Sequence, residues 1–234
     1  MNASDPIPAV VESEATGDVK NIFDDIKNVT GVDVVNLVWR RLAKTENALP
    51  YLWGVLRPLY DSGFINHQAV EFQNQLVFPK LPKFKDEILF ASGIDNLAKI
   101  TINNILASYN RTNTVNLIAL QAALITLTGA EEFVLKPTNK KAASDNLLPM
   151  PRLPAISDLN PTIISLVEEL NSLGEEDGTI IASMYRHLAY WPNYLALVKI
   201  ALEPIASSGE LKRAIDKSRE QSAKKALSLS LIHI

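Results

Sequence analysis

Two asparagines lie at helical spacing where an apolar run begins, so their side chains could meet a ligand. Asn113 and Asn116 are three residues apart, which would place both amides on one face of a helix. Side-chain amides can orient a water molecule or bind an oxygen atom of a ligand. Asn113 also suits the N-cap position of a helix, where asparagine is common. From the residues alone both roles stay open.

Asn36 belongs to a second polar stripe, inside the apolar run Val-Val-Asn-Leu-Val-Trp. Arg40 and Lys44 follow it at intervals of four residues, so the three side chains would share a helix face. An amide and a guanidinium could together bind an anionic ligand, because arginine forms bidentate contacts with carboxylates. The alternative is a solvated helix face with no ligand.

Other kinds of chemistry lack the residues they need. The chain has no cysteine, which excludes disulfides, thiolate metal sites and thiol redox reactions and fits a reducing compartment. His67, His187 and His233 are too scattered to predict a zinc site, and we expect His187 to have a surface or packing role. The sequence therefore predicts no metal and no cofactor.

The elements that would position these residues are helices, because apolar residues recur at intervals of three and four and almost no segment alternates as a strand does. The first predicted helix begins at Thr16 or Asp18 and ends at Thr30-Gly31. Further helices are predicted at 33–44, 49–60, 67–77, 84–91, 95–108 and 113–128. Pro58 should kink or loosen its helix. In the second half of the chain, helices are predicted at 161–173, 179–190, 194–207 and 210–226.

The second half of the chain repeats the first at a constant offset of 146 (186 − 40). Residues 40–63 read RRLAKTENALPYLWGVLRPLYDSG, and residues 186–209 read RHLAYWPNYLALVKIALEPIASSG. A period this long predicts a duplicated domain rather than a solenoid unit. Two related halves would create a seam, which is a favoured place for a ligand. Arg40 and Arg186 recur in both copies, and for both we favour a structural role such as a salt bridge.

The repeat predicts two helical domains, residues 1–135 and residues 155–226. The segment between them, 136–154, is rich in proline and is expected to be a linker. The second copy looks incomplete, because only 25 residues (234 − 209) follow its Ser-Gly stop. The last eight, LSLSLIHI, alternate and break the helical pattern. We expect residues 227–234 to be a non-native tail on a truncated reading frame.

The composition is that of an ordinary globular protein: 234 residues, 47% hydrophobic, 21% charged, with a net charge of −3. Basic residues near the C-terminal end are interleaved with acidic ones, which indicates a solvated helix face rather than a nucleic-acid patch. The N-terminus does not resemble a signal peptide, and the apolar stretch 115–127 is too short to cross a bilayer. We expect a cytoplasmic protein without nucleic-acid or membrane partners, and leave open whether it forms a homodimer.

Three segments together resemble the DehI-type (group I) 2-haloacid dehalogenases. They are IPAV…ATGDVKNIFDDIKNVTGVDVVNLVWRRLA, then ASYNRTN at 107–113, and ASMYRHLAYWPNYLAL at 182–197. The resemblance covers about residues 7–220. It implies an all-α fold of two repeats that form a pseudo-dimer with the active site between them, similar to the AhpD and carboxymuconolactone decarboxylase superfamily. The implied reaction is hydrolysis: an Asp activates a water molecule, which displaces halide from the α-carbon of a 2-haloacid without a covalent intermediate.

The resemblance assigns the water-positioning asparagine of the family to Asn113. The substrate pocket would then contain Val34, Asn36, Leu37, Asn116, Ala182, Ser183 and Met184. At Met184 the family has its catalytic Asp, and a thioether cannot take a proton from water. Losing a positioned general base costs roughly 10²–10⁴-fold in rate. Met184 is expected to line the pocket or pack, and Asp177, about two helical turns upstream, is a poor replacement.

Three functions follow from this comparison. The first is a hydrolytic 2-haloacid dehalogenase, acting on the carbon–halide bond of a small carboxylic acid, with turnover reduced or lost because the Asp is missing. The second is a divergent relative that binds or transforms another small anionic molecule in the same pocket. The third, a redox protein of the AhpD superfamily, is disfavoured by the absence of cysteine.

Overall fold

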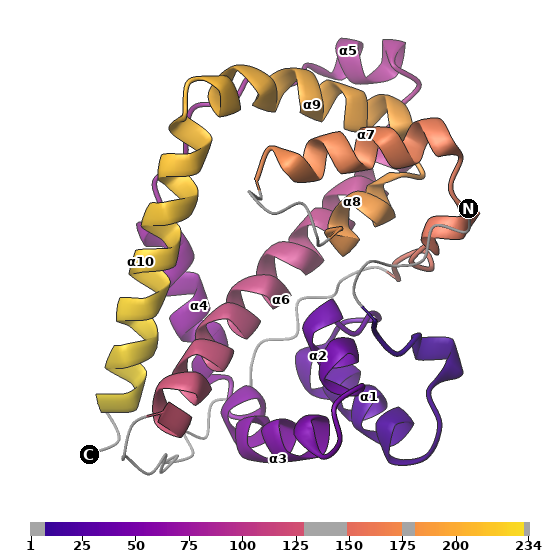
Figure 1. Ribbon diagram of the computed structural model, residues 1–234. Helices are drawn as coiled ribbons and strands as arrows, with labels where there is room; N and C mark the ends of the chain where they lie inside the picture. Colours follow the sequence, from indigo (N-terminus) through magenta and orange to yellow (C-terminus); the bar gives the residue numbers. More distant parts are fainter. Residues whose placement is uncertain (1–7, 129–148, 175–180, 232–234) are drawn as a thin grey trace. The chain divides into compact units, whose positions relative to one another are not determined.

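The computed structural model describes residues 8–128, 149–174 and 181–231 (Figure 1). These residues form helices and connecting segments, with no strand among them, which confirms the predicted all-α class. The described helices are α1 (Gly17–Thr30), α2 (Leu37–Leu42), α3 (Ala48–Asp61), α4 (Phe64–Gln75), α5 (Asp86–Ala91), α6 (Asn96–Thr128), α7 (Pro161–Ser172), α8 (Ser183–Leu188), α9 (Pro192–Ser207) and α10 (Glu210–Leu231), with 3-10 turns at Glu12–Glu14 and Ile156–Asp158.

Several helix ends lie where the sequence predicts them. Gly31 follows α1 with a left-handed φ of 64°, and Gly63 separates α3 from α4 with a φ of 71°. Glycine adopts this conformation without the steric cost that a Cβ atom would bring. Pro192 is at the first position of α9, where its missing N–H leaves no helical hydrogen bond unmade. Pro58 lies inside α3, which continues to Asp61.

Most predicted helices differ by a few residues at their ends, and the differences are largest in α2, α6, α8 and α10. The pair 95–108 and 113–128 is one continuous helix, α6. Within the expected gap, Thr112 Oγ1 donates to the Ser108 carbonyl, and Arg111 Nη2 donates to the carbonyls of Thr30 and Gly31. These contacts hold the polar stretch in the helix. At the other end of the chain, α10 continues to Leu231, so the alternating residues after 226 do not end it.

The predicted helix 33–44 is shorter in the structure, where α2 begins only at Leu37. Both backbone groups of Val35 are held by side chains: its N–H donates to Glu12 Oε1 (2.9 Å) and its carbonyl accepts from Arg40 Nε (3.1 Å). These bonds replace helical ones and keep the segment extended. Arg40 is 5% exposed, and its guanidinium thus has the structural role expected for it.

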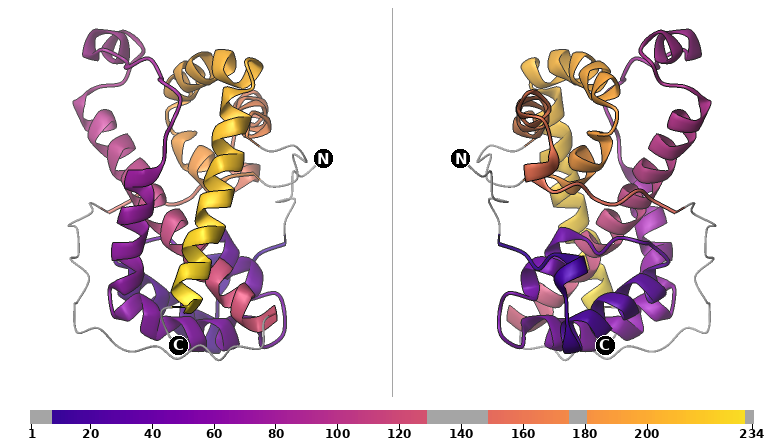
Figure 2. Two further views of the ribbon diagram at one scale, coloured as in Figure 1. Left: turned by 90° about the vertical axis from the view of Figure 1, so that its left-hand side faces the viewer. Right: turned by 90° about the vertical axis from the view of Figure 1, so that its right-hand side faces the viewer.

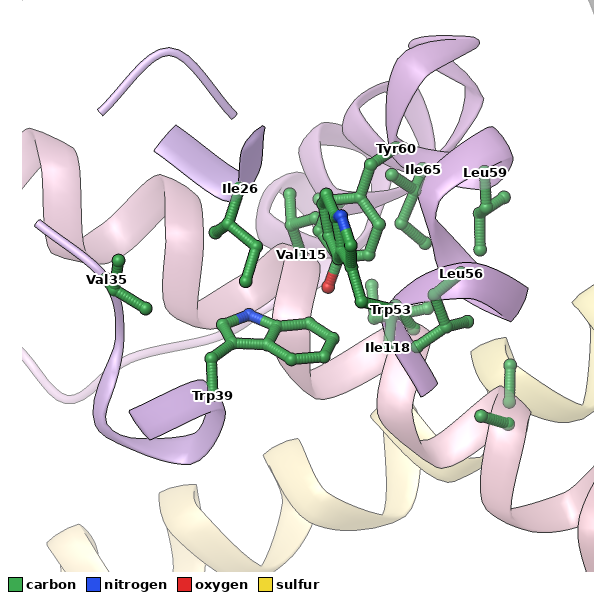
Figure 3. Close-up of a cluster of buried hydrophobic side chains, with 14 of the residues drawn as sticks. Ile26, Val35, Trp39, Trp53, Leu56, Leu59, Tyr60, Ile65, Val115 and Ile118 are labelled. Carbon is green, nitrogen blue, oxygen red and sulfur yellow. The ribbon is translucent and has the colours of Figure 1, made fainter. Parts of the chain in front are cut away.

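The described chain forms two compact units, each assembled from separate segments. We call the first the aromatic unit; its described residues are 9–76, 108–128 and 217–231. In it α3 packs against α1 and α4. Figure 3 shows its core, in which the rings of Trp39, Trp53 and Tyr60 lie beside Val115 and Ile118. The two indole rings meet edge to face with centroids 5.4 Å apart, a favourable arrangement for aromatic pairs.

The second is the α7–α9 unit, whose described residues are 8, 77–107, 149–174 and 181–216. Helices α7, α8 and α9 contact one another and lie together in both views of Figure 2. Arg186 is 5% exposed and donates through Nε and Nη2 to the Pro154 carbonyl. His187 is fully buried with Nε2 2.8 Å from the Pro151 carbonyl oxygen. His187 therefore has a packing role, as expected.

Some helix bounds follow the sequence repeat. Helices α2 and α8 begin at Leu37 and Ser183, and α4 and α10 begin at Phe64 and Glu210, in each case 146 residues apart (183 − 37 and 210 − 64). The duplication itself, and the division at 135 and 155, stay predictions. Most of the predicted linker lies outside the described residues.

Candidate functional site

A groove in the aromatic unit contains four of the predicted site residues. It has a volume of about 440 Å³ and runs along one face of α6, with the start of α2 on its other side. Its lining residues are Asn36, Leu37, Val38, Asn113, Asn116, Leu117, Leu120, Gln121 and Leu124. The α6 members recur at intervals of three and four, which puts them on one helix face. We call this hollow the amide groove.

Asn36 is positioned by the extended segment that precedes α2. Its backbone has a φ of −57° and a ψ of 149°, directly before the first helical residue. The bonds from Glu12 and Arg40 to Val35 fix the neighbouring peptide groups. The pKa of Glu12 is raised, mainly because burial disfavours its charged form. Glu12 and Arg40 therefore support the groove without lining it.

A chain of hydrogen bonds fixes the direction in which the Asn36 and Asn113 amides point. The single hydroxyl proton of Thr112 is donated to the Ser108 carbonyl, so Thr112 Oγ1 accepts from Asn36 Nδ2 at 3.1 Å. The second proton of Asn36 Nδ2 is donated to Asn113 Oδ1 at 2.9 Å. The Nδ2 group of Asn113 therefore remains available to a ligand, as does Asn36 Oδ1.

A second set of bonds fixes Asn116. Its Oδ1 accepts from Trp39 Nε1 at 3.2 Å and from the Tyr60 hydroxyl at 2.7 Å. An indole N–H can only donate, so the atom facing Trp39 must be the amide oxygen. Burial raises the pKa of Tyr60, which keeps its hydroxyl protonated. Asn116 therefore turns its oxygen toward the aromatic core and keeps Nδ2 free of any bond to a described residue.

The structure excludes a helix-capping role for Asn113. This residue lies in the middle of α6, seventeen residues after the first one (113 − 96), so it caps no helix. Its side chain is exposed and bonded to Asn36. The structure therefore excludes the cap, and a ligand-binding role of Asn113 stays a prediction.

The remaining predicted residues are not among those that line the amide groove. Val34 is half-buried in the extended segment before α2. Ala182, Ser183 and Met184 belong to the α7–α9 unit, where Ala182 precedes α8 and its N–H donates to Asn171 Oδ1 at 3.0 Å. Ser183 is buried and Met184 half-buried. Asp177 lies outside the described residues.

Sequence reasoning missed more than half of the groove. The missed residues are Val38, Leu117, Leu120, Gln121 and Leu124. The signal that could have found them is the helical spacing of the last four from Asn113. All four lie inside the predicted helix 113–128, but helical spacing alone does not distinguish an apolar residue that lines a groove from one that packs in the core.

The lining of the amide groove is uncharged. Its nine residues are amides and aliphatic side chains, with no acid, base or histidine among them. Gln121 adds a buried Oε1 that has no hydrogen-bond partner in the described chain. The groove can therefore donate and accept hydrogen bonds, but its lining cannot take a proton from water at neutral pH.

The described segments hold neither a metal-ligand cluster nor a membrane-spanning helix, and their second hollow is remote in sequence from the predicted site residues. No three His, Cys, Asp or Glu side chains there are grouped to hold a metal ion. A second hollow, in the α7–α9 unit, is lined by Asp86, Glu87, Asp95 and Lys99 beside apolar residues, and it contains no residue predicted for the site. Of the described helices, none combines the length and hydropathy that a membrane span needs.

Comparison with protein-family models and with curated proteins gives no match. Solved structures do match. A crystal structure of a D-2-haloacid dehalogenase mutant is 18% identical with a TM-score of 0.74, over 96% of this chain and 78% of that chain. A complex of such a mutant with D-2-CPA has the same values. A D-2-haloacid dehalogenase complex with L-LA is 19% identical with a TM-score of 0.75 and equal coverage. The chain thus has the fold of these D-2-haloacid dehalogenases.

Proposed function

We propose that this chain is a DehI-type 2-haloacid dehalogenase that binds a small carboxylic acid in the amide groove and hydrolyses its carbon–halide bond slowly. One observation carries the proposal: in a fold like that of D-2-haloacid dehalogenases, Asn113 lines a groove with its Oδ1 held by Asn36 and its Nδ2 not bonded to any described residue. The finer features of this assignment, two AhpD-like repeats forming a pseudo-dimer, belong to the same proposal.

In this function Asn113 orients the attacking water. Its amide cannot rotate freely, because Asn36 Nδ2 holds its oxygen and is itself held by Thr112. Because this donor is already fixed, a water molecule bound to it is oriented before the attack, and less entropy is lost in the reaction step. Leu117, one turn after Asn113, would contact the carbon skeleton of the acid.

Slow turnover is expected because no lining residue of the groove can act as a general base. Met184 stands where the family has its catalytic Asp, and a thioether accepts no proton from water at neutral pH. The expected loss is roughly 10²–10⁴-fold in rate.

The second candidate is a binding protein, or an enzyme with another reaction, that uses the same groove for another small acid. The uncharged lining favours it, because two amide N–H groups suffice to bind a ligand oxygen but not to drive hydrolysis. Halide release separates the two candidates.

The test measures halide release from D- and L-2-chloropropionate by the full chain and three variants. Under the dehalogenase proposal, Met184→Asp raises the rate by about 10²-fold or more, and adding Asn113→Ala removes that gain. Met150→Asp is the matched control, because Met150 is also half-buried, and it should leave the rate unchanged. If Met184→Asp folds but releases no more halide than the control, the dehalogenase proposal is wrong.

A further inference from the structure

The amide groove changes character along its length. The amides of Asn36, Asn113 and Asn116 gather at one end, and Leu117, Leu120 and Leu124 follow along α6. With 100° of rotation per residue, Asn113, Leu117, Leu120 and Leu124 all lie within about 40° of one line along the helix. The groove therefore offers hydrogen-bond donors to one end of a ligand and to the rest a largely aliphatic surface, interrupted by the amide of Gln121.

The apolar part is long compared with a three-carbon acid. Asn113 and Leu124 are eleven residues apart on α6, which corresponds to roughly 16 Å of helix rise. The side chains of Leu117 and Leu124 are also solvent-accessible, at 37% and 60% exposed. A propionate bound by the amides would reach Leu117, one turn after Asn113, but would leave Leu124 in water, and apolar surface left in water contributes nothing to binding.

We propose that the amide groove is built for a carboxylic acid with an extended alkyl chain of about six to eight carbons, its polar end at Asn113 and Asn116 and its chain along Leu117, Leu120 and Leu124. This inference rests on the proposed function, since it takes a carboxylic acid as the ligand. It adds the chain length of the acid. The uncharged lining suits it, because the alkyl part needs no ionic partner.

The experiment measures binding directly, so that it does not depend on turnover. Isothermal titration of the full chain with propionate, hexanoate and octanoate, below their micelle concentrations, gives three dissociation constants. Each methylene that becomes buried should tighten binding by up to about fourfold. We therefore expect octanoate to bind at least about 30-fold more tightly than propionate.

Two exposed leucines near the end of α6 provide matched variants. Leu124 lines the groove, whereas Leu127, which is 56% exposed, does not. Both substitutions by alanine should be tolerated, because the side chains are already more than half in water. Leu124→Ala should weaken octanoate binding about threefold to tenfold and leave propionate unchanged, while Leu127→Ala should change neither. In the opposite direction, Gln121→Leu should strengthen octanoate binding, because it extends the apolar wall.

The outcomes are distinguishable. If all three acids bind with equal affinity, the chain-length inference is wrong but the proposed carboxylic-acid ligand stands. If none binds, the proposed function fails, and the inference with it. If Leu127→Ala weakens octanoate binding as much as Leu124→Ala, the alkyl chain does not lie in the groove, and the inference is overturned.

Discussion

Asn113 and Asn116 are chemically identical residues in opposite surroundings. Asn116 is 6% exposed and its Oδ1 satisfies two buried donors, Trp39 Nε1 and the Tyr60 hydroxyl. Asn113 is exposed, and among the described residues its side chain is hydrogen-bonded to that of Asn36. The first residue thus mainly stabilises the aromatic core, whereas the second is available for function.

This contrast predicts different effects for the same substitution. Asn116→Ala should lower the free energy of unfolding by about 2–6 kcal/mol, because it leaves two buried donors unsatisfied at about 1–3 kcal/mol each. Asn113→Ala should change it by less than about 0.5 kcal/mol, as exposed substitutions usually do, and should act on ligand binding instead. Urea unfolding of both variants measures the two changes in the free energy of unfolding. Equal destabilisation would contradict the division of roles.

At the scale of helices, an ion pair joins α1 to α3 within the aromatic unit. Asp25 accepts from Arg57 Nε (2.7 Å) and Nη2 (3.0 Å), and from Trp53 Nε1 (2.7 Å). The hydrogen bonds from Arg57, and then the one from Trp53, lower the pKa of Asp25 below its ordinary value of 3.8. The charged form of Asp25 thus stabilises the folded state relative to the unfolded one.

The sign of this shift predicts acid sensitivity. A carboxyl group whose folded pKa is lowered stabilises the protein fully above its unfolded pKa, and this stabilisation is lost as the pH falls through the folded pKa. The Asp25 side chain is 33% exposed, so we expect only about 1 kcal/mol from the pair. Asp25→Asn should lower stability at pH 7 and reduce its decline below pH 4, as measured by urea unfolding. Glu46→Gln, at an exposed position between α2 and α3, is the control, and an equally large effect there would contradict the prediction.

Helix positions were predictable from the sequence where local signals decide them. Gly31, Gly63 and Pro192 act within their own turns, and the helices they delimit were found to within a few residues. The prediction failed where distant contacts decide. Glu12, 23 residues before Val35, accepts from its N–H and holds the segment before α2 in an extended conformation. Arg111 donates to the carbonyls of Thr30 and Gly31, which are 81 and 80 residues away. The hydrophobic periodicity of a segment carries no information about contacts with residues so far away in the sequence.

The candidate site was predictable to a similar degree. The polar stripe and the family resemblance found Asn36, Leu37, Asn113 and Asn116, which line one groove. Leu117, Leu120, Gln121 and Leu124 lie inside a correctly predicted helical stretch, but their spacing could not show that they line a groove rather than the core. Spacing also could not show that Asn116 faces the core with its oxygen, because that depends on Trp39 and Tyr60, 77 and 56 residues away.

For the molecule as a whole, two helices connect the compact units. The unit boundary falls within α6, between residues 107 and 108, and within α10, between residues 216 and 217. Helix formation is cooperative along a continuous segment. We therefore expect the units to unfold together, although each has its own packed helices.

This expectation can be checked with the tryptophans. Trp39 and Trp53 belong to the aromatic unit and Trp191 to the α7–α9 unit. In a Trp191→Phe variant, fluorescence reports on the aromatic unit alone, whereas far-UV circular dichroism reports on all helices. The two urea transitions should coincide, as in a two-state protein. A dichroism change at a clearly different urea concentration would show independent unfolding.

The fixed amides of the groove restrict proton transfer through their hydrogen-bond network. From Ser108 to Asn113, each proton in the chain of bonds has one acceptor: Thr112 donates to a carbonyl, and Asn36 donates to Thr112 and Asn113. Amide groups neither release nor take up protons at neutral pH. The network can hold a water molecule in a defined orientation, but it is no proton relay, and a water bound there keeps both of its protons until a group outside the amide groove accepts one.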